Sequence, residues 1–125
     1  AGGLKEKIAK AISGGPMMGF AMYTTDTPIT KTSSSILCMS KDEVSACEPT
    51  ACINCGRCVD ACPSRIIPSR LADFAERHDE EAFLKFNGLE CVECGSCSYV
   101  CPAKRQLKQA IGSMRKTALA NKKKK

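Results

Sequence analysis

The sequence predicts a mainly α-helical fold with short β segments near its N-terminal end. In the second half of the chain, apolar residues recur at the spacing of amphipathic helices. The first 48 residues instead hold short apolar pieces separated by Gly, Ser, Thr and Pro, a pattern typical of small strands and turns. A cysteine pattern that occurs twice after position 51 sets a further division. We therefore divide the 125-residue chain into two regions, 1–48 and 49–125.

Four short apolar segments in the first region are expected to be strands. They are too few and too short to form a complete domain. The chain also begins at Ala1 rather than at an initiator methionine, so we interpret it as a fragment of a longer protein. The expected strands lie near Lys10–Ser13, Phe20–Tyr23, Ile29–Thr32 and Ser35–Met39.

Eight of the ten cysteines fall in two copies of one pattern. It is the spacing of bacterial proteins with two iron–sulfur clusters, in which three close cysteines hold one cluster and the fourth binds the other. The pattern therefore predicts an electron carrier with two [4Fe-4S] clusters. The first copy is Cys52-x-x-Cys55-x-x-Cys58-x-x-x-Cys62-Pro63, and the second is Cys91-x-x-Cys94-x-x-Cys97-x-x-x-Cys101-Pro102.

The pattern also predicts which thiols share a cluster. We expect the first cluster to be bound by Cys52, Cys55, Cys58 and Cys101. We expect the second cluster to be bound by Cys91, Cys94, Cys97 and Cys62.

Glycine and proline at fixed places in each copy support this interpretation. Gly56 and Gly95 follow the second cysteine, where we expect a side chain to crowd the close approach of the backbone. Cys62 and Cys101 are expected at the start of a short helix, with the proline after each ending the local turn.

Two other uses of cysteine compete with clusters. Structural zinc also uses Cys-x-x-Cys pairs, but it does not require the third cysteine or the fourth before proline. A disulfide framework fits the cysteine density, yet the internal repeat and the lack of a signal-like apolar run argue against it. Thiols that bind iron imply a reducing compartment, hence the cytoplasm.

The segment between the two cysteine motifs has the pattern of two helices. Ser69 is expected to cap the first helix, which continues to about Arg77. The acidic run Asp79-Glu80-Glu81 is expected to begin the second, and Asn87-Gly88 to end it. Leu71, Phe74, Ala75 and His78 should share one face of the first helix, and Phe74, Phe83 and Phe86 should pack the core and screen the clusters from water.

A final amphipathic helix is predicted after Pro102. Its apolar face is formed by Leu107, Ile111, Met114 and Ala118, and its other face is basic. The segment 103–125 has nine Lys or Arg and no Asp or Glu, whereas residues 1–102 have ten basic and thirteen acidic side chains. Such a tail suits an anionic membrane surface or an acidic partner such as a soluble ferredoxin. Nucleic-acid binding is disfavoured, because no aromatic residues are interleaved with the basic ones.

Three residues outside the pattern could bind metal but are expected to have other roles. Cys38 lies in an expected strand and should be a small buried apolar residue. Cys47 lies close to the first motif, where it could replace a lost ligand. His78, the only histidine, is expected to be structural.

Two functions of different classes therefore remain. The first is an electron-transfer module in which two clusters cycle between redox states. The alternative is a docking module for partner subunits, stabilised by iron–sulfur clusters or zinc that do not cycle. Reversible reduction would separate the two.

Longer stretches of the sequence resemble a known family, the C subunit of the Rnf electron-transport complex. The resemblance covers nearly the whole chain. It is carried by Ile12-Ser13-Gly14-Gly15-Pro16-Met17-Met18-Gly19-Phe20, by Ile29-Thr30-Lys31-Thr32 and by both cysteine motifs.

The resemblance implies an origin and a location for each region. Residues 1–48 would be the end of a β-grasp, soluble-ligand-binding-type domain with a linker, and residues 49–125 a helical two-cluster ferredoxin domain. The protein would lie peripherally on the cytoplasmic face of a bacterial inner membrane, bound to other subunits. That complex would couple electron flow between ferredoxin and NAD to ion transport.

FMN and NAD would bind only in an upstream part, since this chain has no Gly-rich nucleotide motif. Gly14-Gly15 would then form a turn, and Met17-Met18 would pack against apolar neighbours.

Overall fold

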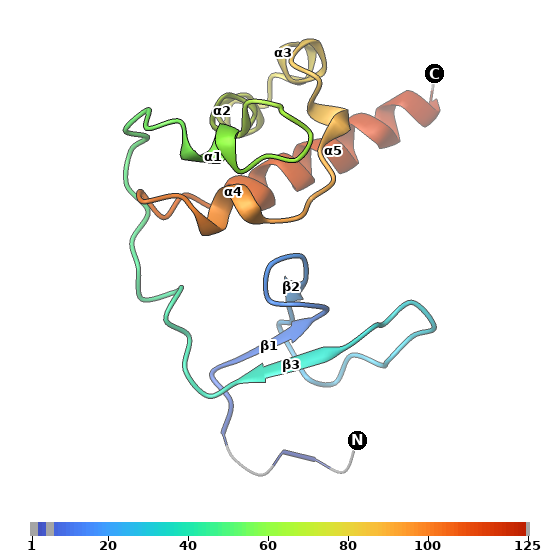
Figure 1. The fold of residues 1–125 in the computed structure, drawn as a ribbon. Coiled ribbons are helices and arrows are strands. Elements are labelled where there is room, and N and C mark those ends of the chain that lie inside the picture. Colours follow the sequence, from blue (N-terminus) through green and yellow to red (C-terminus); the bar gives the residue numbers. More distant parts are fainter. Residues whose placement is uncertain (1–2, 5–6, 125) are drawn as a thin grey trace. The chain divides into compact units, whose positions relative to one another are not determined.

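The computed structural model describes residues 3–4 and 7–124 and divides into two compact units, Ala1–Glu48 and Pro49–Lys125 (Figure 1). The first unit contains a small sheet and the second contains the helices.

The first unit is built on a three-stranded antiparallel sheet with the order β2-β1-β3. Its central strand carries the buried residues of this unit, Ala11 and Ile12, which are 6% and 8% exposed. Ala11 pairs with Cys38, and Ile12 pairs with both Ala21 and Leu37. Three of the four predicted strands are confirmed, two of them shortened: β1 is Lys10–Ser13, β2 is Phe20–Ala21 and β3 is Ile36–Met39.

The fourth predicted strand, Ile29–Thr32, is wrong. The segment forms a turn in which the Ser33 N–H donates to the Thr30 carbonyl at 3.0 Å. The Thr30 N–H in turn donates to the Ser33 hydroxyl at 3.1 Å. Ile29 is 65% exposed, so its apolar side chain does not hold the segment against the sheet. Local hydrogen bonds from Thr and Ser replaced the ladder that apolar content alone suggested.

The glycines between β1 and β2 form a tight turn, as predicted. Gly14 has a φ of +98°, and a Cβ at Gly19 would lie 2.6 Å from the carbonyl oxygens of Ser13 and Gly15. The turn therefore requires glycine at both positions. The expected packing of the two methionines is not seen, because Met17 and Met18 are 40% and 60% exposed.

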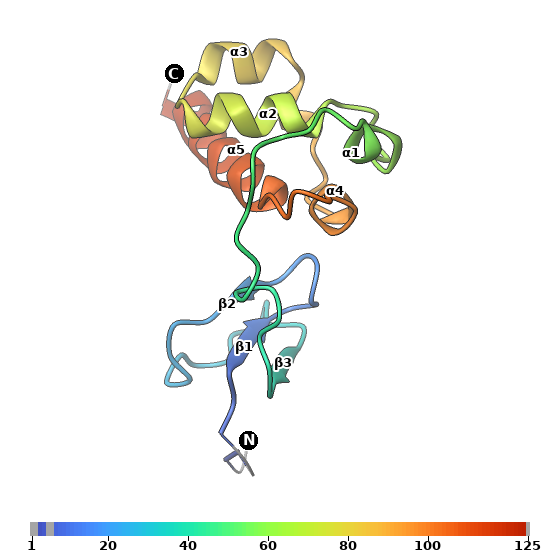
Figure 2. The same cartoon turned by 90° about the vertical axis from the view of Figure 1, so that its left-hand side faces the viewer.

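The second unit packs its longest helix, α5, against α2 and α3. Figure 2 shows α2 lying between α3 and α5, and both views place α1 beside α4. The elements are α1 (Arg57–Asp60), α2 (Pro68–Glu76), α3 (Glu80–Lys85), η1 (Gly88–Glu90), α4 (Ser96–Tyr99) and α5 (Leu107–Lys124).

The core of this unit lies along the predicted apolar face of α5. All four predicted residues of that face are at most 6% exposed, and Phe83 of α3 is fully buried. Leu71, Ala72 and Ala75 of α2 complete the contact from the other side. The final helix and its apolar face are therefore confirmed.

The predicted start of α3 is confirmed, whereas the predicted start of α2 is not. Asp79 caps α3 by accepting from the Ala82 N–H at 3.0 Å, as expected. The cap predicted at Ser69 is wrong, because α2 begins two residues earlier, with Ile67 at the N-cap and Pro68 as its first helical residue. Proline is favoured at this position since its missing N–H would have had no helical partner.

The aromatic and histidine predictions hold only in part. Phe74 and Phe86 contact each other with ring centroids 5.0 Å apart, but Phe86 is 40% exposed. His78 does not share the buried face of α2, because it is exposed after the helix with a φ of 57°. Among the described residues, no helix is both long and apolar enough to span a bilayer.

Candidate cluster-binding sites

The two cysteine loops repeat the same backbone conformation 39 positions apart. Each loop turns through left-handed residues at matching places, which brings successive thiols to one side of the loop. The matching pairs with positive φ are Asn54 and Glu93, Gly56 and Gly95, and Arg65 and Lys104.

A short helix follows the second cysteine in each loop and carries the third. Gly56 precedes α1 with a φ of 78°, and Gly95 precedes α4 with a φ of 84°. A Cβ at Gly56 would meet no protein atom within 4 Å, and the positive φ by itself already favours glycine here. The helices lie before Cys62 and Cys101, which corrects the prediction that a helix begins at the fourth cysteine.

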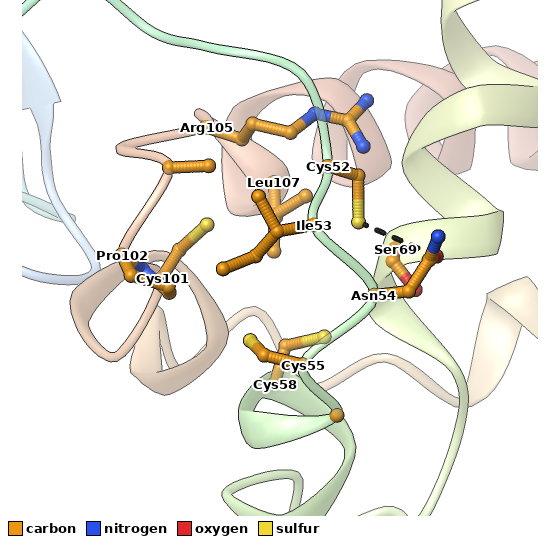
Figure 3. A pocket seen from close by; sticks show the side chains of 12 residues that line it. Cys52, Ile53, Asn54, Cys55, Cys58, Ser69, Cys101, Pro102, Arg105 and Leu107 are labelled. Atoms are coloured by element: carbon orange, nitrogen blue, oxygen red, sulfur yellow. Dashed lines mark hydrogen bonds between the residues drawn. The ribbon is translucent and has the colours of Figure 1, made fainter.

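One cavity, here called site 1, is lined by three cysteines of the first loop and one of the second. Its volume is about 30 Å³. Figure 3 shows Cys101 reaching this hollow from a different chain segment than its three partners. Ile53, Asn54, Ser69, Arg105 and Leu107 complete much of the wall. The cysteines of site 1 are Cys52, Cys55, Cys58 and Cys101.

A second cavity, site 2, has the reverse composition and a volume of about 20 Å³. Its wall includes Val92, Glu93, Lys108 and Ile111. The cysteines of site 2 are Cys62, Cys91, Cys94 and Cys97. Each cavity thus gathers the four thiols expected to share a cluster.

The donor set of each cavity fits a [4Fe-4S] cluster, which takes four cysteine thiolates. Among the residues that the structure describes, the wall of site 1 has no imidazole or carboxylate, and that of site 2 has one carboxylate, that of Glu93. Within the part of the chain that the structure describes, no three or more His, Cys, Asp or Glu side chains form a group that could hold a single metal ion.

The thiols of site 2 differ in their acidity. Hydrogen bonding with Ser96 lowers the pKa of Cys94, whose Sγ lies 3.5 Å from the Ser96 hydroxyl. Burial raises the pKa of Cys91 and raises that of Cys97 to about 11. The Glu93 N–H donates to the Cys91 sulfur at 3.4 Å, which partly offsets the effect of burial there. Binding of metal by these thiols must therefore release protons.

Comparison with known proteins gives the same assignment as the cysteine pattern. Residues 51–105 match a family of 4Fe-4S dicluster domains. Over 123 residues, the chain is 42% identical to the C subunit of a Na⁺-translocating ferredoxin:NAD⁺ oxidoreductase complex from Acetobacterium woodii. It is 52% identical over 111 residues to the C subunit of a proton-translocating complex of the same kind from Clostridium ljungdahlii. The chain belongs to this family of C subunits. The resemblance inferred from the sequence is thereby confirmed.

These matches cover most of this chain and a small part of each relative. They cover 98% of the chain and 28% of the Acetobacterium protein, and 88% and 24% for the Clostridium protein. The C subunit of an ion-translocating oxidoreductase complex from Methanosarcina acetivorans is 44% identical over 110 residues, or 88% of the chain and 25% of the relative. The chain spans about a quarter of the length of these relatives.

The remaining cysteines and the histidine lie outside both cavities. Cys38 is exposed on β3, so the expectation that it would be buried is wrong. Cys47 is also exposed, with its sulfur 3.5 Å from the Glu43 carbonyl oxygen. His78 lines neither cavity.

Charged residues in the cavity walls were missed by the sequence reasoning. Arg105 lines site 1, and Glu93 and Lys108 line site 2. The Arg105 guanidinium is 2.9 Å from both Asp73 and Glu76 of α2. Burial lowers the pKa of Arg105, but these two hydrogen-bonded carboxylates outweigh it and raise the pKa overall. Aligning the two motifs at their repeat of 39 would have drawn attention to these positions.

Proposed function

We propose that this chain is an electron-transfer module that binds two [4Fe-4S] clusters in a membrane-associated, ion-translocating ferredoxin:NAD oxidoreductase complex. The observation that carries the proposal is the crossed set of four thiols around each cavity. Membership of the family of C subunits supports the same complex.

The proposed ligands are those predicted from the spacing. Site 1 would use Cys52, Cys55, Cys58 and Cys101, and site 2 would use Cys91, Cys94, Cys97 and Cys62. When bound, a cluster of this type supplies one-electron chemistry, since its iron changes valence without breaking a substrate bond.

The protein's own contribution is to hold the thiols and exclude water. Leu107 is 2% exposed beside site 1, and Ile111 is fully buried beside site 2. Each site takes its fourth cysteine from the other motif, which ties the two loops together. The two sites therefore form one rigid unit. A fixed, partly desolvated pair of sites suits electron passage with little reorganisation.

Other parts of the proposal concern the complex. Residues 1–48 are assigned to the end of a β-grasp, soluble-ligand-binding-type domain, and 49–125 to the helical ferredoxin domain. Flavin and nicotinamide sites are assigned outside residues 1–125. Other subunits of the complex and soluble ferredoxin are the proposed partners, with the chain on the cytoplasmic side of the membrane. The basic end of α5 suits an anionic partner surface.

A redox titration of anaerobically purified protein tests this function. Reduction and reoxidation should follow the same curve through repeated cycles, and two interacting reduced clusters should give electron paramagnetic resonance signals. The alternative, a docking module with static clusters or zinc, predicts no reversible reduction under the same conditions. Electron uptake from reduced ferredoxin, monitored by bleaching of the visible absorbance, would test the proposed partner.

A further inference from the structure

The two cavities are built from equivalent positions, which makes their differences informative. Twelve wall residues of site 1 each have a counterpart 39 positions away in the wall of site 2. Most pairs are identical or similar, as with Ile53 and Val92. The pair Arg105 and Ile66 is different, because one residue is a cation and the other is apolar.

Each member of this pair follows the fourth cysteine of its motif by four residues. Ile66 follows Cys62, is 8% exposed and belongs to the hydrophobic core, so apolar packing holds that segment. Arg105 follows Cys101, and its side chain is 11% exposed. At this one position the contact with α2 is made by charge instead, while Ala103 and Leu107 on either side of Arg105 are buried.

The charged contact joins one guanidinium group to two carboxylates. The same guanidinium nitrogen of Arg105 lies 2.9 Å from Asp73 and 2.9 Å from Glu76. Figure 3 shows the side chain running past site 1 with its guanidinium beyond the cavity. The neighbouring Ala103 carbonyl also accepts from the Thr50 N–H at 2.9 Å, which ties the segment to the chain just before Cys52.

The thiols of site 1 also include a more solvent-exposed cysteine than those of site 2. Site 1 includes the exposed Cys55, whereas site 2 includes the buried Cys97, a member of the core. A charged contact that is partly open to solvent weakens with salt, while apolar packing does not. At this position the wall of site 1 is thus held by a more salt-sensitive contact than the matching position of site 2.

We propose that Arg105 is a positioning residue for site 1 alone, and that its contacts with Asp73 and Glu76 keep the Cys101 thiol facing that cavity. The inference rests on the proposed cluster binding. It makes site 1 the more labile of the two sites, so that partial loss of iron leaves a protein with one cluster at site 2.

The test uses the 125-residue chain, purified anaerobically, with Arg105→Gln and the double variant Asp73→Asn/Glu76→Gln. Both should lower iron from about eight to about four per chain and leave the spectrum of a single reduced cluster. In both, Cys55 should react with iodoacetamide about tenfold faster than in the parent protein, while Cys94 stays protected. Arg105→Lys should restore part of the protection, because an ammonium can still contact one carboxylate.

Two controls separate positioning from general loss of stability. Arg70→Gln removes an exposed charge from α2, the helix that carries Asp73 and Glu76, and Arg115→Gln removes an ionic contact near site 2. Neither should expose Cys55.

If Arg105→Gln lost both clusters equally, or kept both in high salt, the proposal would be overturned. Opposite effects of Arg105→Gln and the double variant would also overturn it, since they would indicate a charge effect rather than positioning. Absence of clusters from the parent protein would instead refute the proposed function.

Discussion

The guanidinium of Arg115 lies 3.2 Å from the carboxylate of Glu93, which ties α5 to the second cysteine loop. Arg115 also donates from Nε to the Leu89 carbonyl at 3.2 Å. Three residues before Arg115 stands Gly112, where a Cβ would lie 3.0 Å from the same Glu93 carboxylate. The small residue in α5 therefore makes room for the side chain that closes one wall of site 2.

Enlarging Gly112 should displace Glu93 and loosen this wall. Gly112→Leu should destabilise the protein by about 1–3 kcal/mol, because the larger side chain at this buried position would meet the Glu93 carboxylate and displace it from Arg115. Ser113→Leu on the same helix is the control, since Ser113 is exposed. Anaerobic thermal unfolding followed by circular dichroism would measure both. An unchanged midpoint for Gly112→Leu would contradict the contact.

Crossed ligation predicts which cluster each fourth cysteine supports. Cys62→Ser should damage the cluster of Cys91, Cys94 and Cys97, and Cys101→Ser should damage the cluster of the first loop. Iron content, electron paramagnetic resonance and the reactivity of the released thiols measure the outcome. Cys38→Ser, which changes an exposed thiol outside both sites, should leave both clusters intact. Loss of the cluster of the same loop in each variant would show that ligation is not crossed.

Phe83 and Gly88 should be strongly coupled in stability. A Cβ at Gly88 would lie 2.3 Å from the ring of Phe83, which is fully buried and cannot move aside freely. Gly88→Ala should therefore cost about 1–3 kcal/mol, and Phe83→Ala about 3–5 kcal/mol. The cost of Gly88→Ala should be smaller in a Phe83→Leu protein than in the parent, because the ring is gone; the cycle uses these two single variants and their combination. A double-mutant cycle from anaerobic unfolding measures this coupling, and strict additivity would argue against the contact.

The sheet of the first unit should weaken in acid. Lys10 lies 2.8 Å from Asp42, and hydrogen bonds from Lys10 and Ser45 lower the pKa of Asp42 from 3.8 to about 2. A carboxyl group whose pKa is lowered in the folded state stabilises the fold at pH values above its pKa in the unfolded chain. This stabilisation is lost as the pH falls from about 4 to about 2. The protection of amide protons in β1 and β3, measured by nuclear magnetic resonance relative to the intrinsic exchange rate at each pH, should therefore fall over this range. Asp42→Asn should remove that dependence, and an identical pH profile in the variant would contradict the assignment.

Strong periodic signals in the sequence predicted most of the helical unit. The apolar series from Leu107 to Ala118 and the acidic start at Asp79 were sufficient for α5 and α3. The cap of α2 was missed because Ser69 looks like a cap in sequence, while Pro68 beside it fits the first helical turn better. The false strand at Ile29–Thr32 arose because local Thr and Ser hydrogen bonds competed with an apolar pattern.

The sites, like the fold, could be predicted only in part from the spacing of residues in the sequence. The cysteine spacing predicted the two groups of thiols that the fold brings together. It could not predict Arg105, since its role depends on α2 passing near the segment after Cys101. That contact joins residues about thirty positions apart through tertiary packing, which no local pattern encodes.

The most direct test of cluster binding is the iron and acid-labile sulfide content of the anaerobically purified protein, measured together with zinc. Two bound clusters predict about eight iron and eight sulfide per chain, with signals from two interacting clusters after reduction by dithionite. Zinc at about one or two per chain, with no cluster formed even after anaerobic reconstitution with iron and sulfide, would contradict cluster binding. In that case the cavities would be structural metal sites, and electron transfer would not be the function of this chain.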